Sequence, residues 1–299
     1  MTIHWCGTGL SSGPGLRNLI KKGNDVCVWN RTIKKAQDVV GDITRNIEPF
    51  NMTSLKGRLK EGDLIVSMLP TGWHVPLAKL AIEHKAHFIS SSYITPEMQC
   101  IHNKAKNAGV CIVNEVGLDP GIDHLMAHIL VNDYRMAPEN SKDNILTFKS
   151  YCGGIPKNPN SFRYKFSWSP AGVLKALCAP SKSIKNFSEF AVDRPWDAIS
   201  SYNAPLPKSE SFEVYPNRDS LPYIKQYNFE PSWKIKEFVR GTLRLNGWAK
   251  AWRHVFDELQ TLRGSSADAR IQEMSSQLWA ENAYADKEPD RVVLCVGLK

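Results

Sequence analysis

The first third of the chain alternates short apolar runs with amphipathic stretches, a pattern typical of a parallel sheet flanked by helices. The apolar runs predict strands at Thr2–Cys6, Asp25–Asn30, Asp63–Leu69, His87–Ser91 and Val110–Val116. The stretches between them predict helices at Gly13–Lys22, Ile33–Val40, Val75–His84 and Pro96–Ala108. Right-handed crossovers between these elements would give an α/β fold with an open, doubly wound parallel sheet of the Rossmann type.

The pattern changes after Pro120. Residues 193–233 are rich in Pro, Ser, Asn and Tyr and predict long ordered loops, whereas helical apolar spacing returns between Gly247 and Trp279. Two domains are therefore expected, 1–124 and 125–299, the second an α/β domain with a small helical part at residues 233–285. Its other predicted elements are helices at Gly121–Leu130 and Gly172–Leu177 and strands at Leu146–Cys152, Phe162–Ser167 and Arg291–Leu298.

Length and composition fit this interpretation. The chain has 299 residues, of which 42% are hydrophobic and 23% charged, as in ordinary globular proteins. No run approaches the roughly 20 apolar residues that a membrane-spanning helix needs. The chain also does not open with a basic segment followed by an apolar run. The sequence thus predicts a cytoplasmic protein without a membrane partner.

The seven cysteines form no CxxC pair and no cluster with metal-ligand spacing. Reduced thiols are therefore expected, with neither a disulfide framework nor a metal site. The formal net charge is +8, and the basic residues are spread from Arg17 to Lys299 instead of forming one stripe. This distribution argues against a nucleic-acid partner and leaves two interpretations, a solvated basic surface or an anionic small-molecule partner.

A glycine-rich turn follows the first predicted strand and opens the first predicted helix. Its glycines are Gly7, Gly9 and Gly13, spaced GxGxxxG, one residue longer than the usual dinucleotide fingerprint. Such glycines allow a tight turn and a close approach of backbone to a pyrophosphate, while the helix N-terminus favours negative charge. The turn therefore predicts a dinucleotide site, although a purely structural helix cap would use glycines in the same way.

The end of the second predicted strand indicates which dinucleotide the chain binds. An NAD site needs an acidic residue near its end to bind the ribose 2′-hydroxyl, but the chain has Asn30, Arg31 and Thr32 there. The planar guanidinium of Arg31 can instead pair with a 2′-phosphate, which favours NADP(H). The alternative is that Arg31 is an ordinary surface residue.

Four further groups of residues form a recognisable pattern. They are Ser92–Pro96; Asn114–His124; Tyr151–Gly154 with Lys165–Pro170; and Tyr215–Ser220 with Arg240–Arg244. In order and spacing they resemble the saccharopine dehydrogenase family of the NADP-dependent, L-glutamate-forming type, also called saccharopine reductase. The resemblance runs from about Gly7 to Trp248, and the block around Leu118-Asp119-Pro120-Gly121 is highly specific.

The resemblance implies an oxidoreductase of lysine metabolism that works as a homodimer. Its members interconvert saccharopine with glutamate and 2-aminoadipate 6-semialdehyde, through an imine and a hydride transfer to or from NADP(H). The first domain would bind the cofactor, and the second would serve substrate binding, catalysis and dimerisation. The expected partners are accordingly small molecules and a second copy of the chain.

Position by position, the resemblance assigns site residues on this chain. Besides the glycine turn, cofactor contacts fall on Leu10, Ser11, Ser12, Asn30, Arg31, Thr32, Ser90, Ser91, Leu118, Asp119, Pro120 and Ser169. Substrate contacts fall on Ser92, Tyr93, Asp119, Arg218, Thr242, Leu243 and Arg244, and the candidate catalytic residues are Tyr93, Asp119 and Cys152.

These residue types suit a substrate with three carboxylates and an amine. Arg218 and Arg244 can each clamp a carboxylate, Asp119 suits the cationic amine, and Tyr93 can donate a hydrogen bond. Structural alternatives exist: a loop ion pair for Arg218 with Asp219, a capped turn at Asp119, and a buried thiol for Cys152. His124 is expected to be a packing residue, and the group that transfers protons stays open.

Some features depart from the family. Its members continue past the position of Lys299, so the second domain is expected to be incomplete, as a natural variant or as a fragment. Gly247–Ala285 agrees poorly with the family, and its acidic residue after the third strand has no clear counterpart, with Asn51 nearby. Two other functions stay open, a related C–N oxidoreductase such as a lysine dehydrogenase or carboxynorspermidine synthase, and a non-catalytic NADP-binding protein.

Overall fold

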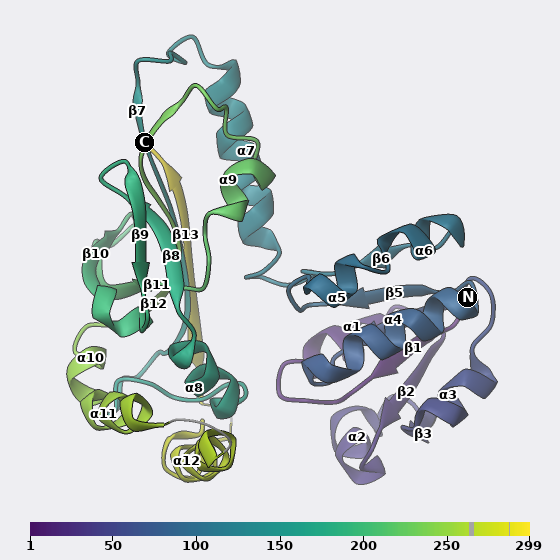
Figure 1. The fold of residues 1–299 in the computed structure, drawn as a ribbon. Helices are drawn as coiled ribbons and strands as arrows, with labels where there is room; N and C mark the ends of the chain where they lie inside the picture. The colour runs from purple at the N-terminus through teal and green to yellow at the C-terminus, as the bar shows by residue number, and fades with distance from the viewer. Residues whose placement is uncertain (263–265, 287) are drawn as a thin grey trace. The chain divides into compact units, whose positions relative to one another are not determined.

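The chain folds into two compact units, Met1–Ile122 and Asp123–Lys299, each with its own sheet (Figure 1). The computed structural model describes residues 1–262, 266–286 and 288–299. Among these residues, no helix is both long enough and apolar enough to span a bilayer.

Unit 1 is built on a six-stranded parallel sheet in the order β3-β2-β1-β4-β5-β6. This is the strand order of the doubly wound dinucleotide-binding fold. The strands are β1 (Ile3–Cys6), β2 (Val26–Asn30), β3 (Ile47–Pro49), β4 (Leu64–Ser67), β5 (His87–Ser90) and β6 (Ile112–Val113). The helices are α1 (Gly13–Lys21), α2 (Ile33–Val40), α3 (Met52–Arg58), η1 (Thr71–Trp73), α4 (His74–Glu83), α5 (Pro96–Gln99) and α6 (His102–Asn107).

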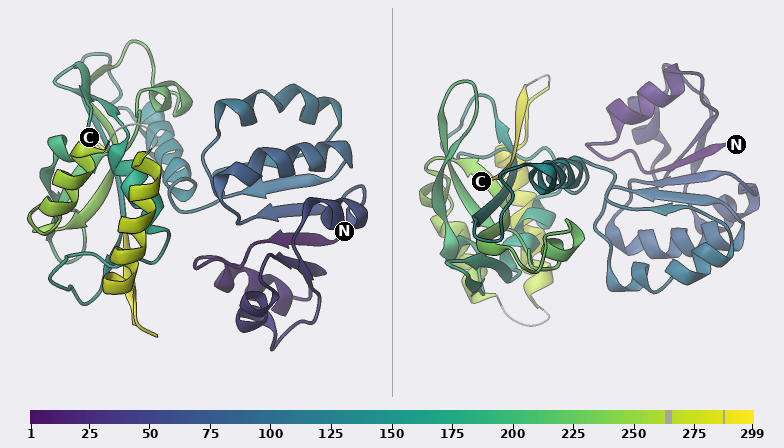
Figure 2. Two further views of the ribbon diagram at one scale, coloured as in Figure 1. Left: turned by 60° about the horizontal axis from the view of Figure 1, so that its bottom comes forward. Right: turned by 90° about the horizontal axis from the view of Figure 1, so that it is seen from above.

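Alternate residues of these strands face two different apolar layers. Trp5 packs with α1 and α2 on one face, whereas its neighbour Cys6 packs with α3, α4 and α5 on the other. Helices therefore cover both faces of the sheet, as the two views in Figure 2 show. Both faces are buried, which explains why the strands read as continuous apolar runs in the sequence.

Three details of unit 1 differ from the sequence prediction. Strand β3 and helix α3 were not predicted, because β3 is a short edge strand and α3 is polar; Asn51 caps α3, its Oδ1 accepting from Ser54 N at 2.7 Å. The predicted helix over 96–108 is broken into α5 and α6, and the last predicted strand shrinks to Ile112–Val113.

Unit 2 contains a mixed sheet with the strand order β10-β11-β12-β7-β13, and the hairpin of β8 and β9 joins it through β12. Its strands are β7 (Ile145–Pro156), β8 (Ser181–Lys185), β9 (Ser188–Val192), β10 (Ser200–Ala204), β11 (Glu210–Pro216), β12 (Lys234–Leu245) and β13 (Asp290–Leu298). The helices are α7 (Ile122–Met136), α8 (Pro170–Cys178), η2 (Pro195–Ala198), α9 (Pro222–Gln226), α10 (Trp248–Ala251), α11 (Arg253–Thr261) and α12 (Ser266–Asn282).

Two groups of helices pack against one face of this sheet. At one end, α7 and α9 lie next to Phe148 and Phe238, and at the other end α8, α10, α11 and α12 surround Tyr215 (Figure 1). The opposite face carries a separate apolar cluster that includes Leu243 and Val214. The middle of the first face, between the helical groups, is where the central strands present their polar side chains.

Two expectations for the second domain are wrong, and strand periodicity is the reason. The helical part does not begin at 233, because residues 234–245 form β12 and the helices start at Trp248. Residues 193–233 are not mainly loop, since they contain η2, β10, β11 and α9. Strands β10 and β12 alternate polar and apolar residues, so their composition alone resembles that of a loop or a surface helix.

The segment 162–167 is also not a strand. It makes one isolated bridge, between Phe166 and Ala283, and its aromatic side chains join the helical cluster of α10–α12. The Phe162 ring stacks on the Trp252 ring with 4.7 Å between their centroids, and the Tyr164 ring packs edge-on against the same indole with a centroid distance of 5.4 Å. The apolar alternation of this segment therefore serves side-chain packing instead of a sheet.

Candidate functional site

The glycine turn lies between the end of β1 and the start of α1. Gly7 has φ +102°, and a Cβ there would come within 2.9 Å of the Met68 carbonyl oxygen, so only glycine fits this close approach. Gly9, Leu10 and Ser11 are exposed. The turn thus places an open stretch of backbone in front of the N-terminus of α1, which favours an anion.

Ser12 closes this turn from within. Its side chain is buried, its Oγ donates to the Gly9 carbonyl at 2.8 Å, and its backbone N–H donates to the same oxygen at 3.1 Å. The carbonyl of Ser12 accepts from Leu16 N at 3.1 Å and so begins α1, which starts at Gly13. Ser12 therefore fixes the shape of the turn that Gly9, Leu10 and Ser11 expose.

Asn30 links the turn to the end of β2. Its Oδ1 accepts from Thr8 N at 3.2 Å, and its Nδ2 donates to the Thr32 carbonyl at 2.8 Å. Arg31 is exposed and forms no ion pair with the described residues, and Thr32 is the N-cap position of α2. The Oγ1 atom of Thr8 is buried without a hydrogen-bond partner in the described chain.

These features fit a dinucleotide with a 2′-phosphate. The open turn can hold the pyrophosphate, the Thr8 hydroxyl can donate to a phosphate oxygen, and Arg31 can pair with the 2′-phosphate. No carboxylate stands at the end of β2, where it would repel that phosphate. Unit 1 can therefore hold NADP(H).

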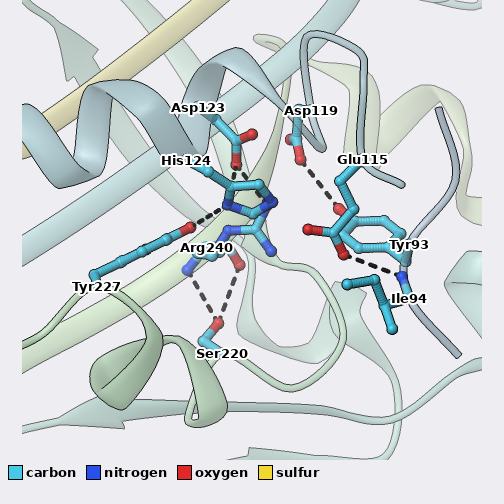
Figure 3. A network of polar contacts seen from close by, with 9 residues as sticks. All are labelled: Tyr93, Ile94, Glu115, Asp119, Asp123, His124, Ser220, Tyr227 and Arg240. Atoms are coloured by element: carbon cyan, nitrogen blue, oxygen red, sulfur yellow. Dashed lines mark hydrogen bonds and ion pairs between the residues drawn. The ribbon is translucent and has the colours of Figure 1, made fainter. Parts of the chain in front are cut away.

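A second cluster in unit 1 surrounds the segment after β5. Ser90 Oγ donates to Asn114 Oδ1 at 3.0 Å and accepts from Ser92 N at 3.3 Å. Tyr93 Oη donates to Asp119 Oδ1 at 3.0 Å, as Figure 3 shows. The structure thus brings two predicted site residues, Tyr93 and Asp119, into direct contact across 26 residues of sequence.

Glu115 holds this segment in place. Its carboxylate accepts from Ile94 N at 3.1 Å (Figure 3). Its backbone N–H donates to the Ser92 carbonyl at 3.1 Å. Glu115 adopts φ +61°, a conformation that costs a non-glycine residue about 1–2 kcal/mol. The strain lets one residue clamp the backbone on both sides of Tyr93.

Asp119 lies in a tight turn that needs glycine. A Cβ at Gly121, which has φ +147°, would come 2.1 Å from the Gly117 carbonyl oxygen. That oxygen also accepts from Ile122 N at 3.0 Å, and the bond between Asp119 and Pro120 is cis. Leu118 and Ser91 lie at the same turn, since Leu118 bridges to Gly121 and Ser91 lies next to Gly117.

In unit 2, predicted residues share one face of the sheet. Thr242 on β12 pairs with Tyr215 on β11 and with Cys152 on β7, so their side chains point to the same side. Arg244 follows two residues later on this face. Leu243 faces the opposite apolar cluster and is fully buried there, so its side chain lies away from this row.

Arg244 is a buried cation in an aromatic environment. The residue is 6% exposed, and its guanidinium carbon lies 4.8 Å from the Tyr164 ring, 5.7 Å from the Tyr215 ring and 5.5 Å from the Trp248 ring. Its Nη1 donates to the Leu243 carbonyl at 3.1 Å, while its Nε has no partner among the described residues. Arg244 also takes part in none of the ion pairs of the described chain, and burial raises the pKa of the neighbouring Tyr215 phenol.

The carboxylate opposite Arg244 is already used. Glu213 is the cross-strand partner of Arg244, but its oxygens accept from Gly247 N at 2.9 Å and Ala249 N at 2.7 Å. Glu213 therefore caps α10, and its charge serves the helix N-terminus. Arg244 is left with aromatic rings, the Tyr215 phenol and a carbonyl as neighbours.

Arg240, on the same face of β12, has a carboxylate partner, although its Nε also lacks a hydrogen-bond partner among the described residues. Its Nη2 donates to Asp123 Oδ2 at 2.6 Å, and its guanidinium carbon lies 4.1 Å from the Tyr223 ring. Asp123 is completely buried and belongs to the first turn of α7. His124 Nδ1 lies 2.7 Å from Tyr227 Oη (Figure 3). The His124 ring also stacks on the Tyr223 ring, as expected for a packing residue.

Two predicted residues lie on loops of unit 2. Arg218 is exposed and has φ +58°, and its carbonyl accepts from Lys182 N at 2.9 Å. Ser169 is the N-cap of α8, its Oγ accepting from Gly172 N at 3.2 Å. Both residues therefore lie on loops outside β7 and β12, the strands that carry Cys152 and Thr242.

Comparison with known proteins decides the ancestry. Residues 3–113 match the saccharopine dehydrogenase NADP-binding domain, and residues 117–299 match the saccharopine dehydrogenase C-terminal domain. The chain belongs to the saccharopine dehydrogenase family. This confirms the predicted family. It also confirms the Rossmann-type fold with a second domain and the NADP-binding first domain.

Individual relatives agree with this assignment. The chain is 34% identical over 249 residues to the NADP-dependent, L-glutamate-forming saccharopine dehydrogenase of Pyricularia oryzae. That match covers 81% of this chain and 54% of the relative. The chain is 36% identical over 233 residues to the alpha-aminoadipic semialdehyde synthase of Arabidopsis thaliana, covering 75% of this chain and 21% of the relative. The chain thus spans about half the length of the first relative and less of the second.

Among solved structures, the apo saccharopine dehydrogenase (L-Glu forming) of Saccharomyces cerevisiae matches with a TM-score of 0.77 at 25% identity. The match covers 98% of this chain and 80% of that chain. The fold of this family member therefore follows that of the yeast enzyme over nearly all of its length.

Sequence reasoning missed three groups in this family member. They are His74, the clamp residue Glu115 and the pair of Asp123 with Arg240, whose members are 117 residues apart. Glu115, Asp123 and Arg240 lie within segments that carry the family resemblance, but the local sequence assigns them no role. His74 lies outside those segments. A charged residue within an apolar strand or at a helix start, such as Arg240 or Asp123, was the available signal.

The buried pair makes a stability prediction. Replacing Arg240 by Met leaves Asp123 as a buried carboxylate without its cation, so the free energy of unfolding should fall by about 3–5 kcal/mol. Urea unfolding followed by tryptophan fluorescence measures this change. The double variant R240M with Asp123→Leu removes both charges and should recover most of the loss; a double variant as unstable as R240M alone would contradict the explanation.

Proposed function

We propose that this protein is an NADP-dependent oxidoreductase that interconverts saccharopine with L-glutamate and 2-aminoadipate 6-semialdehyde. Its relatives carry the names of enzymes of this chemistry. The single observation that carries the proposal is Arg244, a buried guanidinium without a carboxylate partner in the described chain. A buried charge is costly unless it is paired, so an anionic ligand completes this environment.

The chemistry of the substrate matches the groups of unit 2. Saccharopine carries three carboxylates, and a planar guanidinium binds a carboxylate with two parallel hydrogen bonds. Arg244 is assigned to one carboxylate and the exposed Arg218 to another. Thr242 and the Leu243 backbone flank Arg244 on β12, which places further hydrogen-bonding groups along the strand.

Unit 1 contributes groups for the cofactor and for the amine. Bound NADP(H) supplies or accepts the hydride, and the open turn, Arg31 and the Thr8 hydroxyl hold it in this unit. Tyr93 donates to Asp119, which orients the carboxylate and leaves it as an acceptor for the cationic amine. Ser169 of unit 2 is assigned to the cofactor as well.

Proton transfer is assigned to the candidates Asp119 and Tyr93, with Cys152 as the third. An Asp119→Asn variant keeps the shape and the hydrogen bond of Tyr93 but cannot take a proton. Cys152 lies next to Thr242 in the polar row and is half-buried. Its thiol is therefore close to a predicted substrate contact, although cysteines in strands are more often packing residues.

We also propose a homodimer in a reducing compartment such as the cytoplasm. Strand β13 is the last strand in the order β10-β11-β12-β7-β13, and Val292 on it is 51% exposed. The outer edge of β13 can therefore pair with a second copy of the chain. None of the seven cysteines, all of which the structure describes, is in a disulfide, which suits a reducing environment. Light scattering during size-exclusion chromatography measures the mass, and a monomer at micromolar concentration would contradict the dimer.

Turnover is the direct test of the proposed function. The purified protein with glutamate, 2-aminoadipate 6-semialdehyde and NADPH should oxidise NADPH, measured by the nicotinamide absorbance. Omission of glutamate should abolish the signal, because imine formation needs its amine. Tight NADPH binding without oxidation, across several aldehyde and amine pairs, would instead indicate a binding protein without catalysis.

Arg31 should set the choice of cofactor. Arg31→Ala removes the cation proposed for the 2′-phosphate, so the Kd for NADPH should rise about 10- to 100-fold, given about 1.5–3 kcal/mol for a charged hydrogen bond. The Kd for NADH, measured by the same fluorescence titration, should stay within about twofold. Lys35→Ala, which changes an exposed cation of α2, serves as the control. Equal losses for both cofactors would contradict the assignment.

Arg244 should matter for binding and not for folding. Arg244→Met should raise the KM for saccharopine about 10- to 100-fold through loss of the charged clamp. The free energy of unfolding without ligand should change by less than about 1 kcal/mol, because no buried carboxylate loses its partner and Met suits an aromatic environment. R240M is the matched control on the same strand. An R244M variant as unstable as R240M would show a structural role instead.

A further inference from the structure

One buried histidine bridges the carboxyl ends of two neighbouring strands in unit 1. His74 begins α4 and is 6% exposed. Its Nδ1 lies 2.9 Å from the Oγ of Ser67, the last residue of β4, and its Nε2 lies 2.8 Å from the Oγ of Ser92, which follows β5. His74 therefore connects a fully buried serine to one of the predicted substrate contacts.

The surroundings of the His74 imidazole favour its neutral form. Burial lowers its pKa below the ordinary histidine value of 6.5, and no described carboxylate pairs with it. The edge-on Phe88 ring at 6.4 Å adds an apolar wall. A neutral imidazole has one donating and one accepting nitrogen, so its two serine contacts differ in direction.

Ser67 decides which nitrogen accepts. The side chain of Ser67 is fully buried, and His74 Nδ1 is the one acceptor that the described residues offer to its hydroxyl. Buried hydroxyl groups are almost always hydrogen-bonded, so Ser67 donates to Nδ1. The proton of the ring then stands on Nε2, which donates to Ser92 Oγ.

This direction fixes the role of Ser92. Its Oγ accepts from His74, and no described residue accepts a hydrogen bond from its hydroxyl. Its backbone is held by Ser90 Oγ and by Glu115 N. The hydroxyl proton of Ser92 is therefore available to a ligand, while its lone pairs are partly engaged.

We propose that His74 is a positioning residue that sets the Ser92 hydroxyl as a hydrogen-bond donor to a carboxylate oxygen of the amino-acid substrate. The proposal rests on the proposed function and deepens it. Ser92 would recognise an anionic end of the substrate, while Asp119, held by the adjacent Tyr93, recognises the cationic amine. Ser92 and Asp119 would thus bind opposite charges and orient a zwitterionic substrate.

Steady-state kinetics test the coupling. Ser92→Ala and His74→Leu should each raise the substrate KM about tenfold, the effect expected for one hydrogen bond to a charged group. The double variant should be no worse than S92A alone, because both changes remove the same interaction. His74→Gln keeps a donor near Nε2 and should recover most of the affinity. His102→Leu, at an exposed histidine of α6, is the control.

Binding of NADPH separates this role from a structural one. Its Kd should stay within about twofold in S92A and H74L, since neither side chain belongs to the glycine turn or to the Arg31 region. If the KM effects of the two substitutions add up, or if H74Q is as poor as H74L, the proposal is wrong.

Nitrogen-15 NMR of the His74 ring supplies a readout that needs no turnover. The expected signals show an unprotonated Nδ1 and a protonated Nε2, and Ser67→Ala should shift the tautomer balance. A protonated Nδ1 in the wild-type protein overturns the proposal. Wild-type turnover with unchanged KM in S92A also overturns it, whereas loss of the proposed function itself would appear as absent wild-type turnover.

Discussion

Two buried guanidinium groups on one strand decide how the second unit is organised. Arg240 and Arg244 lie on the same face of β12, about 13 Å apart for four residues of strand, and both are nearly inaccessible to water. The fold supplies Asp123 to Arg240, and it gives Arg244 three aromatic rings and a carbonyl. Because a buried charge needs a counter-charge, Arg240 finds one within the chain in Asp123, whereas Arg244 is suited to an anionic ligand.

The distribution of acidic residues produces this difference. The cross-strand neighbour of Arg244 is Glu213, whose oxygens are held by the first amides of α10. A short helix therefore takes the carboxylate that would otherwise neutralise Arg244. The aromatic cluster beneath α10 keeps the guanidinium dry, which strengthens any interaction that it makes with a carboxylate.

In unit 1, by contrast, the strands of the parallel sheet position the loops that carry the predicted site residues. The carboxyl ends of β4, β5 and β6 meet at one edge of the sheet, where hydrogen bonds link Ser67 to His74, His74 to Ser92, and Ser92 through Ser90 to Asn114. Ligands of doubly wound sheets bind at this edge. Glu115 and the turn around Gly121 then hold Tyr93 and Asp119 against each other, at the expense of backbone strain.

Local sequence was sufficient for the elements that depend on local rules. The parallel strands of unit 1 are buried on both faces and therefore appear in the sequence as apolar runs. The glycine turn can be found in the sequence because its backbone geometry requires glycine at Gly7. Arg31 could be found because it stands at a fixed distance from that turn. The family resemblance named Tyr93, Asp119 and Arg244, but it could not say that the first two touch.

Tertiary structure decided everything that depends on partners far apart in the chain. The strand β12 and the polar tract 193–233 were misjudged, because alternating residues acquire their meaning only when neighbouring strands cover one face. The same holds for charge. Nothing near Arg240 or Arg244 in the sequence tells them apart, and only packing against Asp123, Glu213 and the aromatic rings makes one an internal ion pair and the other a cation suited to a ligand.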